Sequence, residues 1–185
     1  MPIDPQSAFK SAISSIKPTN GPLWAKDIAD AVDGLVTNKA GLSVITGTCT
    51  FTFNKALFMA GIMALVPILA APIAAQTIGI AWGNAMLASI MVVQPGAFIG
   101  VVSAPPTLFS VITSTIVDPP SVVAAQTALI ATLSAMQAVK IASDSALGPA
   151  LHTAFMSCTA TVTGMNSIPP PAGPLLLIAP LCPFL

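Results

Sequence analysis

Two apolar stripes at helical spacing open the chain. The first stripe consists of Phe9, Ala12, Ile13 and Ile16, and the second of Trp24, Ile28, Val32 and Leu35. Apolar residues three or four positions apart occupy one face of a helix. The breakers Lys17-Pro18 and Asn20-Gly21-Pro22 separate the two stripes. We therefore predict two amphipathic helices in a polar N-terminal segment, residues 1–40.

The hydrophobic period changes to two in later segments. Apolar residues alternate with threonine at 48–53, and a second alternation runs through 158–163. Such alternation is typical of half-buried strands. We predict two short strands that either pair with each other or each extend a sheet of a neighbouring subunit. The stretch 100–117, rich in Val, Ile, Thr and Phe, is also compatible with extended chain.

The middle of the chain is almost entirely apolar. Residues 56–75 reach the length that crosses a bilayer, but Pro67 and Pro72 would interrupt a helix there. The next run holds Gly79 and Gly83, a pair of small residues that lets two helices approach closely. Such a pair is typical of membrane helix dimers, and close packing inside a protein core explains it equally well.

The strongest helix signal begins at Asp118, a capping residue followed by two prolines in the permissive first turn. The apolar positions of one face are Val122, Leu129, Leu133 and Met136. Alanine fills most other positions, so we expect this helix to be buried on all sides. A further helix is predicted from Ser143 or Asp144 to Phe155.

The segment 168–185 is rich in proline, which excludes a regular helix. We expect it to form an extended hydrophobic strap that lies across a neighbouring subunit. The apolar residues of this strap are Leu175, Leu176, Leu177, Ile178, Leu181 and Phe184. An exposed tail of this kind would promote aggregation, so we expect a permanent partner.

The composition favours a protein that belongs to an assembly. Hydrophobic residues make up 55% of the 185 positions and charged residues 6%, against about 25% charged in ordinary domains. Disordered proteins have the opposite composition. Nucleic-acid binding needs a basic surface, and the net charge here is zero. We predict a mainly α-helical protein with minor β structure, an obligate oligomer whose compact hydrophobic core spans residues 41–167.

Few residues could support chemistry. An active site could be assembled only from Asp144 as a carboxylate and His152 as a base, together with Cys158 or a serine as the nucleophile. A packed histidine is the simpler explanation of His152, and a buried free thiol is the simpler explanation of Cys158. Asp27, Asp30 and Asp33 share one side of a helix but lack further ligands for a cation. We therefore predict that the protein is not an enzyme and binds no cofactor and no metal. An enzyme that uses Asp144, His152 and Cys158 is kept as the last-ranked hypothesis.

Several motifs occur in an order that is similar to that of a known group of proteins. The motifs are Gly47-Thr48, the stretch 50–54, Ala81-Trp82, the stretch 91–96, the stretch 118–125, the stretch 150–155 and the stretch 161–167. Their order resembles small hydrophobic virion proteins encoded among the tail and baseplate genes of contractile-tailed bacteriophages. The resemblance implies a structural virion subunit that packs with copies of itself and with other tail or baseplate proteins. It also implies contact with the host envelope, and thus lipid, on infection.

An integral membrane protein, such as a holin-like or small channel-forming subunit, is the alternative. The absence of charge between Lys55 and Asp118 favours a location in the membrane. The prolines oppose it, and the loops near residues 94–97, 103–106 and 164–174 carry no Lys or Arg that would orient spans by the positive-inside rule. The first 40 residues are also not expected to act as a cleavable signal, because they are polar and broken by prolines.

Overall fold

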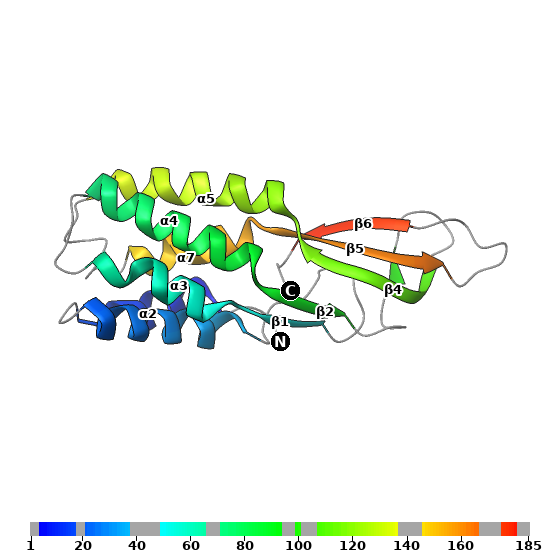
Figure 1. Ribbon diagram of the computed structural model, residues 1–185, viewed down its shortest axis with the longest axis horizontal. Coiled ribbons are helices and arrows are strands. Elements are labelled where there is room, and N and C mark those ends of the chain that lie inside the picture. Colours follow the sequence, from blue (N-terminus) through cyan, green and yellow to red (C-terminus); the bar gives the residue numbers. More distant parts are fainter. Residues whose placement is uncertain are drawn as a thin grey trace.

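A helical bundle at one end and two small sheets at the other make up the molecule (Figure 1). The computed structural model describes residues 4–17, 21–37, 49–65, 71–93, 99–100, 107–136, 146–166 and 175–180. Within these ranges the chain is mainly helical, which confirms the predicted fold class at that level. The oligomeric state remains a prediction.

Six α-helices lie in the described ranges. They are α1 (Gln6–Ser14), α2 (Gly21–Val36), α3 (Lys55–Ile62), α4 (Ala71–Leu87), α5 (Pro119–Ser134) and α7 (Leu147–Met156), with a short 3-10 turn, η1 (Met63–Leu65), after α3. The two predicted N-terminal helices are confirmed as α1 and α2. α1 buries Phe9 and Ile13, while Trp24, Ile28 and Val32 are buried on α2.

α4 shows how position decides what a proline does. Pro72 lies in the first turn of α4 and so begins this helix, because a proline there removes no intrahelical hydrogen bond. Gly79 and Gly83 lie where α4 meets α5. A Cβ atom at Gly79 would stand 2.9 Å from Ile130 Cδ1, and one at Gly83 would stand 2.8 Å from Gln126 Cδ. The absence of both side chains lets the two helices pack closely.

α5 and α7 begin near the predicted positions, but the expectation that α5 is buried on all sides is wrong. α5 is an outer helix that packs on α4 and α7 (Figure 1). It buries Val122, Leu129 and Leu133 along one face and exposes Val123 on the other. Alanine and threonine fill much of the outer face, and small side chains of this kind are compatible with either environment.

Asp118 stands at the predicted N-cap position of α5, yet its carboxylate does not cap the helix. Instead, Thr159 Oγ1 donates a hydrogen bond to Asp118 Oδ2 at 2.9 Å. Ser121 Oγ accepts from the Thr159 amide at 2.9 Å. The start of α5 is therefore tied to the strand that follows α7.

Aromatic rings from separate elements meet at the centre of the bundle. The Phe155 ring of α7 lies 5.5 Å from those of Phe53 and Trp82 and 6.2 Å from that of Phe9, measured between centroids. All four rings are buried, and their contacts are tilted or edge-to-face, as aromatic pairs prefer. One core therefore unites α1 and α2 with the later helices. The predicted boundaries at residues 40–41 and 167–168 lie outside the described ranges.

The strands form two antiparallel sheets. β1 (Cys49–Thr52) pairs with β2 (Ile90–Val93). The second sheet has the order β3 (Ile99–Gly100), β4 (Thr107–Val117), β5 (Thr159–Asn166) and β6 (Leu175–Pro180). The two predicted strands correspond to β1 and β5, which lie in different sheets and do not pair with each other. Each finds a partner strand in the same chain.

Part of the predicted strap lies in β6. Leu175 is opposite Gly164 of β5, and Pro180 is opposite Thr159. Leu181 and Phe184 lie outside the described residues. The proposed contact of the strap with a neighbouring subunit remains a prediction.

Candidate functional site

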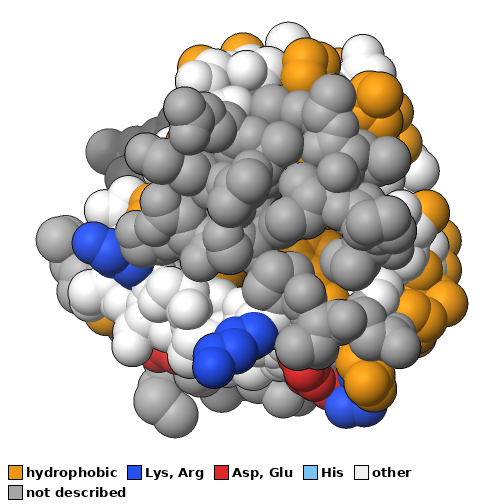
Figure 2. Space-filling model, turned by 90° about the vertical axis from the view of Figure 1, so that its left-hand side faces the viewer, with side chains coloured by type: hydrophobic (Ala, Val, Ile, Leu, Met, Phe, Trp, Pro, Cys, Tyr) orange, Lys and Arg blue, Asp and Glu red, His pale blue; other side chains and the backbone are white. Residues whose placement is uncertain are grey.

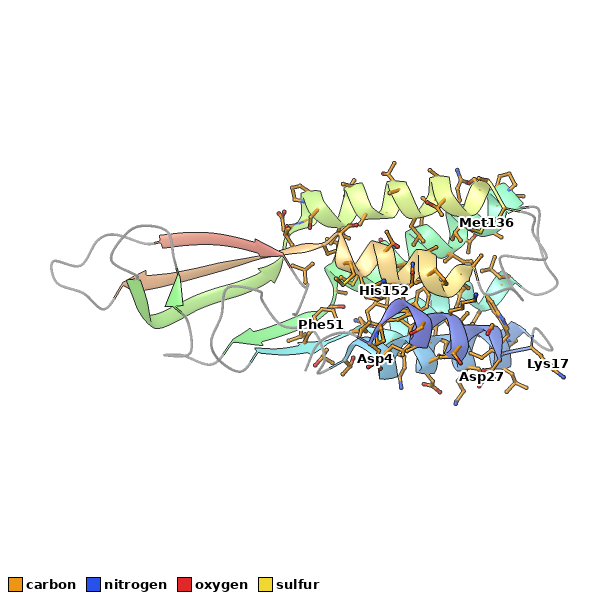
Figure 3. The ribbon with its side chains drawn as sticks, turned by 180° about the vertical axis from the view of Figure 1, so that it is seen from behind. Asp4, Lys17, Asp27, Phe51, Met136 and His152 are labelled. Carbon is orange, nitrogen blue, oxygen red and sulfur yellow. The ribbon has the colours of Figure 1, made fainter. Side chains whose placement is uncertain are left out.

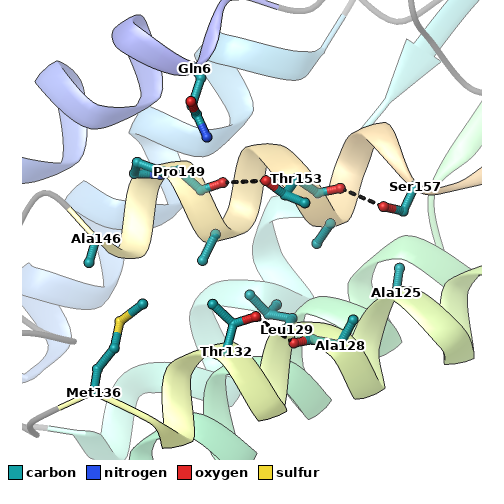
Figure 4. Close-up of a pocket in the computed structure, with 12 residues that line it drawn as sticks. Gln6, Ala125, Ala128, Leu129, Thr132, Met136, Ala146, Pro149, Thr153 and Ser157 are labelled. Atoms are coloured by element: carbon teal, nitrogen blue, oxygen red, sulfur yellow. Dashed lines mark hydrogen bonds between the residues drawn. The ribbon is translucent and has the colours of Figure 1, made fainter.

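A groove with a volume of about 340 Å³ lies between α5 and α7. Figure 4 shows Gln6 of α1 above it, Met136 at one end and Ser157 towards the other. The lining residues are Gln6, Ala125, Ala128, Leu129, Thr132, Met136, Ala146, Pro149, Ala150, Thr153, Ala154 and Ser157. This volume is near the lower end of ligand pockets, which start at about 300 Å³.

The hydroxyl groups of this groove are directed to the backbone of their own helices. Thr153 Oγ1 donates to the Pro149 carbonyl at 3.0 Å, and Ser157 Oγ donates to the Thr153 carbonyl at 2.8 Å (Figure 4). Thr132 does the same towards Ala128 at 2.9 Å. The groove therefore presents mainly methyl groups, and none of its lining side chains is titratable. It can hold an apolar group but offers no acid or base for proton transfer.

Sequence reasoning missed this groove. The small residues that line it recur at intervals of three and four on both helices, as in Ala125, Ala128 and Thr132 on α5 and Ala150 and Ala154 on α7. That spacing was the available signal. It does not distinguish a small-residue face that contacts a helix from one that leaves a groove open.

His152 of the predicted active-site grouping faces α1. Its ring meets the Phe9 ring edge-on, with centroids 5.2 Å apart and planes at 72°. Burial lowers the pKa of His152 from its ordinary value of 6.5. Asp144 lies outside the described residues. Within the described ranges, no hydrogen bond joins His152 to a carboxylate or to Cys158.

Cys158 lies just after α7, and its thiol is buried. Its Sγ donates to the Ala154 carbonyl at 3.4 Å. Burial raises the pKa of Cys158 to about 12, with a smaller contribution from the negative charge of Asp118. Because the thiolate is the nucleophile, this environment opposes the activation that a catalytic cysteine needs.

Two of the three acidic residues of α2, Asp30 and Asp33, form ion pairs with lysines. Lys26 Nζ lies 2.7 Å from Asp30 Oδ2, while Lys55 Nζ of α3 lies 3.0 Å from Asp30 Oδ1 and 3.6 Å from Asp33 Oδ2. The hydrogen bonds from Lys26 and then Lys55 hold the pKa of Asp30 below its ordinary value of 3.8. Asp27 lies on the outer side of α2 (Figure 3). In the described ranges, no three His, Cys, Asp or Glu residues form a group that could hold a metal ion.

Among the described residues, none of the helices combines the length and the apolar character that a bilayer span requires.

Comparisons with known proteins gave no relative. No model of a protein family matches the chain, and neither a curated protein nor a solved structure with significant similarity was found.

Proposed function

We propose that this chain is a structural, non-enzymatic subunit of a multimeric assembly. The observation that carries the proposal is a set of large aliphatic side chains exposed on several helices and beside them. They are Leu23, Leu57, Met63, Ile73, Ile80, Leu87 and Ile90. Three of them, Leu57, Ile73 and Ile80, line one surface groove, and grouped apolar surface marks sites of association in soluble proteins.

The distribution of charge supports association on particular faces. Ion pairs tie α2 to α3 through Asp30, Asp33 and Lys55, so these charges satisfy one another within the chain. Figure 2 shows charged side chains in the lower part of the view and hydrophobic side chains along its right-hand edge. Hydrophobic surface of this kind is usually buried against a permanent partner, because obligate interfaces are more hydrophobic than transient ones.

The chemistry of the described residues favours a structural role. The groove between α5 and α7 is lined by groups that cannot exchange protons near neutral pH. Burial raises the pKa of the Cys158 thiol to about 12, which disfavours the thiolate even above neutral pH. These properties suit packing better than catalysis.

The order of motifs leads to the more specific part of the proposal, a tail or baseplate component of a virion. In that setting the neighbours are copies of the chain and other tail or baseplate proteins, and lipid of the host envelope is met on infection. Purified particles from the source of this sequence test this part directly. The chain should be found by mass spectrometry in the tail fraction, and its absence from particles would contradict the virion assignment.

Light scattering on protein expressed without detergent tests the proposal as a whole. We expect a discrete multimer with a mass that is an integer multiple of 18.6 kDa. A monodisperse monomer at all concentrations would overturn the structural-subunit proposal. Recovery from membranes alone, with solubility only in detergent, would favour a holin-like or channel-forming membrane protein instead.

A further inference from the structure

One face of the bundle carries an apolar ridge. Ile73, Ile80 and Leu87 recur every seven residues along α4, and their side chains are 47–52% exposed. Residues seven apart return nearly to the same side of a helix, so the three form a row. α3 and α4 lie at the front of the bundle in Figure 1, and this front corresponds to the hydrophobic right-hand edge of Figure 2.

A groove of about 350 Å³ runs beside the ridge, between α3 and α4. The two helices approach closely beside it because Gly61 has no side chain. A Cβ atom there would stand 2.5 Å from the Cβ of Ala81. Leu57, 41% exposed, lies on the α3 side of the groove, and Ile73 and Ile80 lie on the α4 side. Ridge and groove are thus adjacent and parallel.

The polar groups of this face can form hydrogen bonds with the same groups of a second copy. Gln76 and Asn84 are exposed, and both line the groove. A carboxamide both donates and accepts hydrogen bonds, so it can pair with the same group of another copy. None of the residues that line the groove is charged, and Lys55 at the start of α3 is already bound to Asp30. Lipid chains would leave the amides without partners, which costs free energy.

We propose that this α3–α4 face binds the same face of a second copy of the chain across a two-fold axis. An isologous interface brings the same patch of both copies together, so the ridge of each copy can lie in the groove of the other. A stable dimer buries about 800 Å² on each partner. That is about a tenth of the 8784 Å² exposed by one chain. This inference rests on the proposed function, because it names the partner within the assembly.

The first test places a charge at the centre of the face. Ile80→Lys should lower the mass of the detergent-free assembly at least twofold in light scattering, because two lysines would meet across the axis. Val123→Lys on α5 is the matched control, since Val123 is also aliphatic and 54% exposed but lies on another helix. This control should keep the wild-type mass. Circular dichroism verifies that both variants remain helical.

The second test detects the second copy directly and does not depend on the fold of the lysine variant. Ile80→Cys should give a covalent dimer with a short bismaleimide, because the two Ile80 positions lie near the axis. Val123→Cys and the wild-type chain, which keeps its three native cysteines, should give much less. Equal cross-linking of Ile80→Cys and Val123→Cys would overturn the inference.

The outcomes separate this inference from the proposed function. A multimer that keeps its mass in Ile80→Lys contradicts the α3–α4 interface but leaves the structural-subunit proposal in place. A wild-type monomer at every concentration overturns both. Wild-type protein that needs detergent, together with an Ile80→Lys variant that does not, would show that lipid covers the face and would also overturn the inference.

Discussion

Cys158 lies at the end of α7 with its thiol buried, and burial raises its pKa to about 12. We expect iodoacetamide to modify Cys158 very slowly in the folded protein at pH 8 and rapidly in denaturant, because the thiolate is the reactive form. Peptide mapping by mass spectrometry separates this residue from Cys49 and Cys182. Equal rates in the folded and denatured protein would show that the thiol is accessible and ionised.

His152 should make stability depend on pH. Its folded-state pKa is lowered by burial, whereas the unfolded chain keeps the ordinary value of 6.5. Below pH 6.5 the unfolded state therefore binds a proton that the folded state binds less readily. The contribution of His152 is fully present above pH 6.5 and is lost as the pH falls through the lowered folded-state pKa.

The measurement is a thermal melt at pH 7.5 and at pH 5.5. The wild-type melting temperature should fall at the lower pH, and His152→Gln should reduce that fall. Asp30 does not interfere in this window, because its pKa lies below 3.8. An equal fall in both proteins would assign the pH dependence to another group.

At the scale of elements, the contact of α1 with α7 depends on Gly148. A Cβ atom at this position would lie 2.6 Å from the Phe9 carbonyl carbon and 2.9 Å from the Lys10 amide nitrogen. These are backbone atoms, so no side chain can rotate away. We expect Gly148→Ala to lower the free energy of unfolding by about 3 kcal/mol, near the upper end of overpacking effects.

Gly34 is the matched control, because a Cβ atom there meets nothing within 4 Å. Gly34→Ala should raise the free energy of unfolding by about 0.5–1 kcal/mol, since alanine is the better helix former within α2. Urea unfolding followed by circular dichroism at one protein concentration measures both variants. Equal effects would mean that α1 does not pack on α7 as described.

The structure confirms the predicted helices whose sequence signal is local. The stripes through Phe9 and Trp24 identify α1 and α2, because a helix face is set by residues three and four apart. Strand pairing depends on distant segments, so alternation located β1 and β5 but not their partners. The sequence alone does not decide whether Pro72 interrupts a helix or lies in the first turn of one. The position where α4 begins decides it.

The candidate grooves were harder to predict for a related reason. Alanine and threonine on α5 fit a buried face and an open one equally well. The ridge on α4 was present in the sequence as Ile73, Ile80 and Leu87 at seven-residue intervals. Its exposure follows from where α3 and α5 pack, which is a property of the tertiary structure.

For the whole molecule, the scarcity of charge predicts how the proposed assembly responds to salt. The ion pairs of Asp30 and Asp33 lie within one chain, and the α3–α4 face has no charged lining residue. Association should therefore depend on apolar contact, which sodium chloride screens little and sulfate strengthens.

Sedimentation velocity at about 0.05 M and about 0.5 M sodium chloride should give the same distribution of species, since both concentrations act mainly by screening charges. Addition of ammonium sulfate should shift the distribution towards larger species. Dissociation of the multimer by sodium chloride would contradict an apolar interface and would indicate ion pairs between chains.

The contact between Phe9 on α1 and Gly148 on α7 has a consequence for synthesis on the ribosome. The two residues are about 140 positions apart in the chain. At about 5–20 residues per second, α7 follows α1 by about 7–28 s. During that interval the apolar stripe of α1 lacks its final partner. The strand β4 likewise lacks its partner strand until β5 has been synthesised after α7. A chaperone that binds amphipathic helices would find its substrate in this nascent chain.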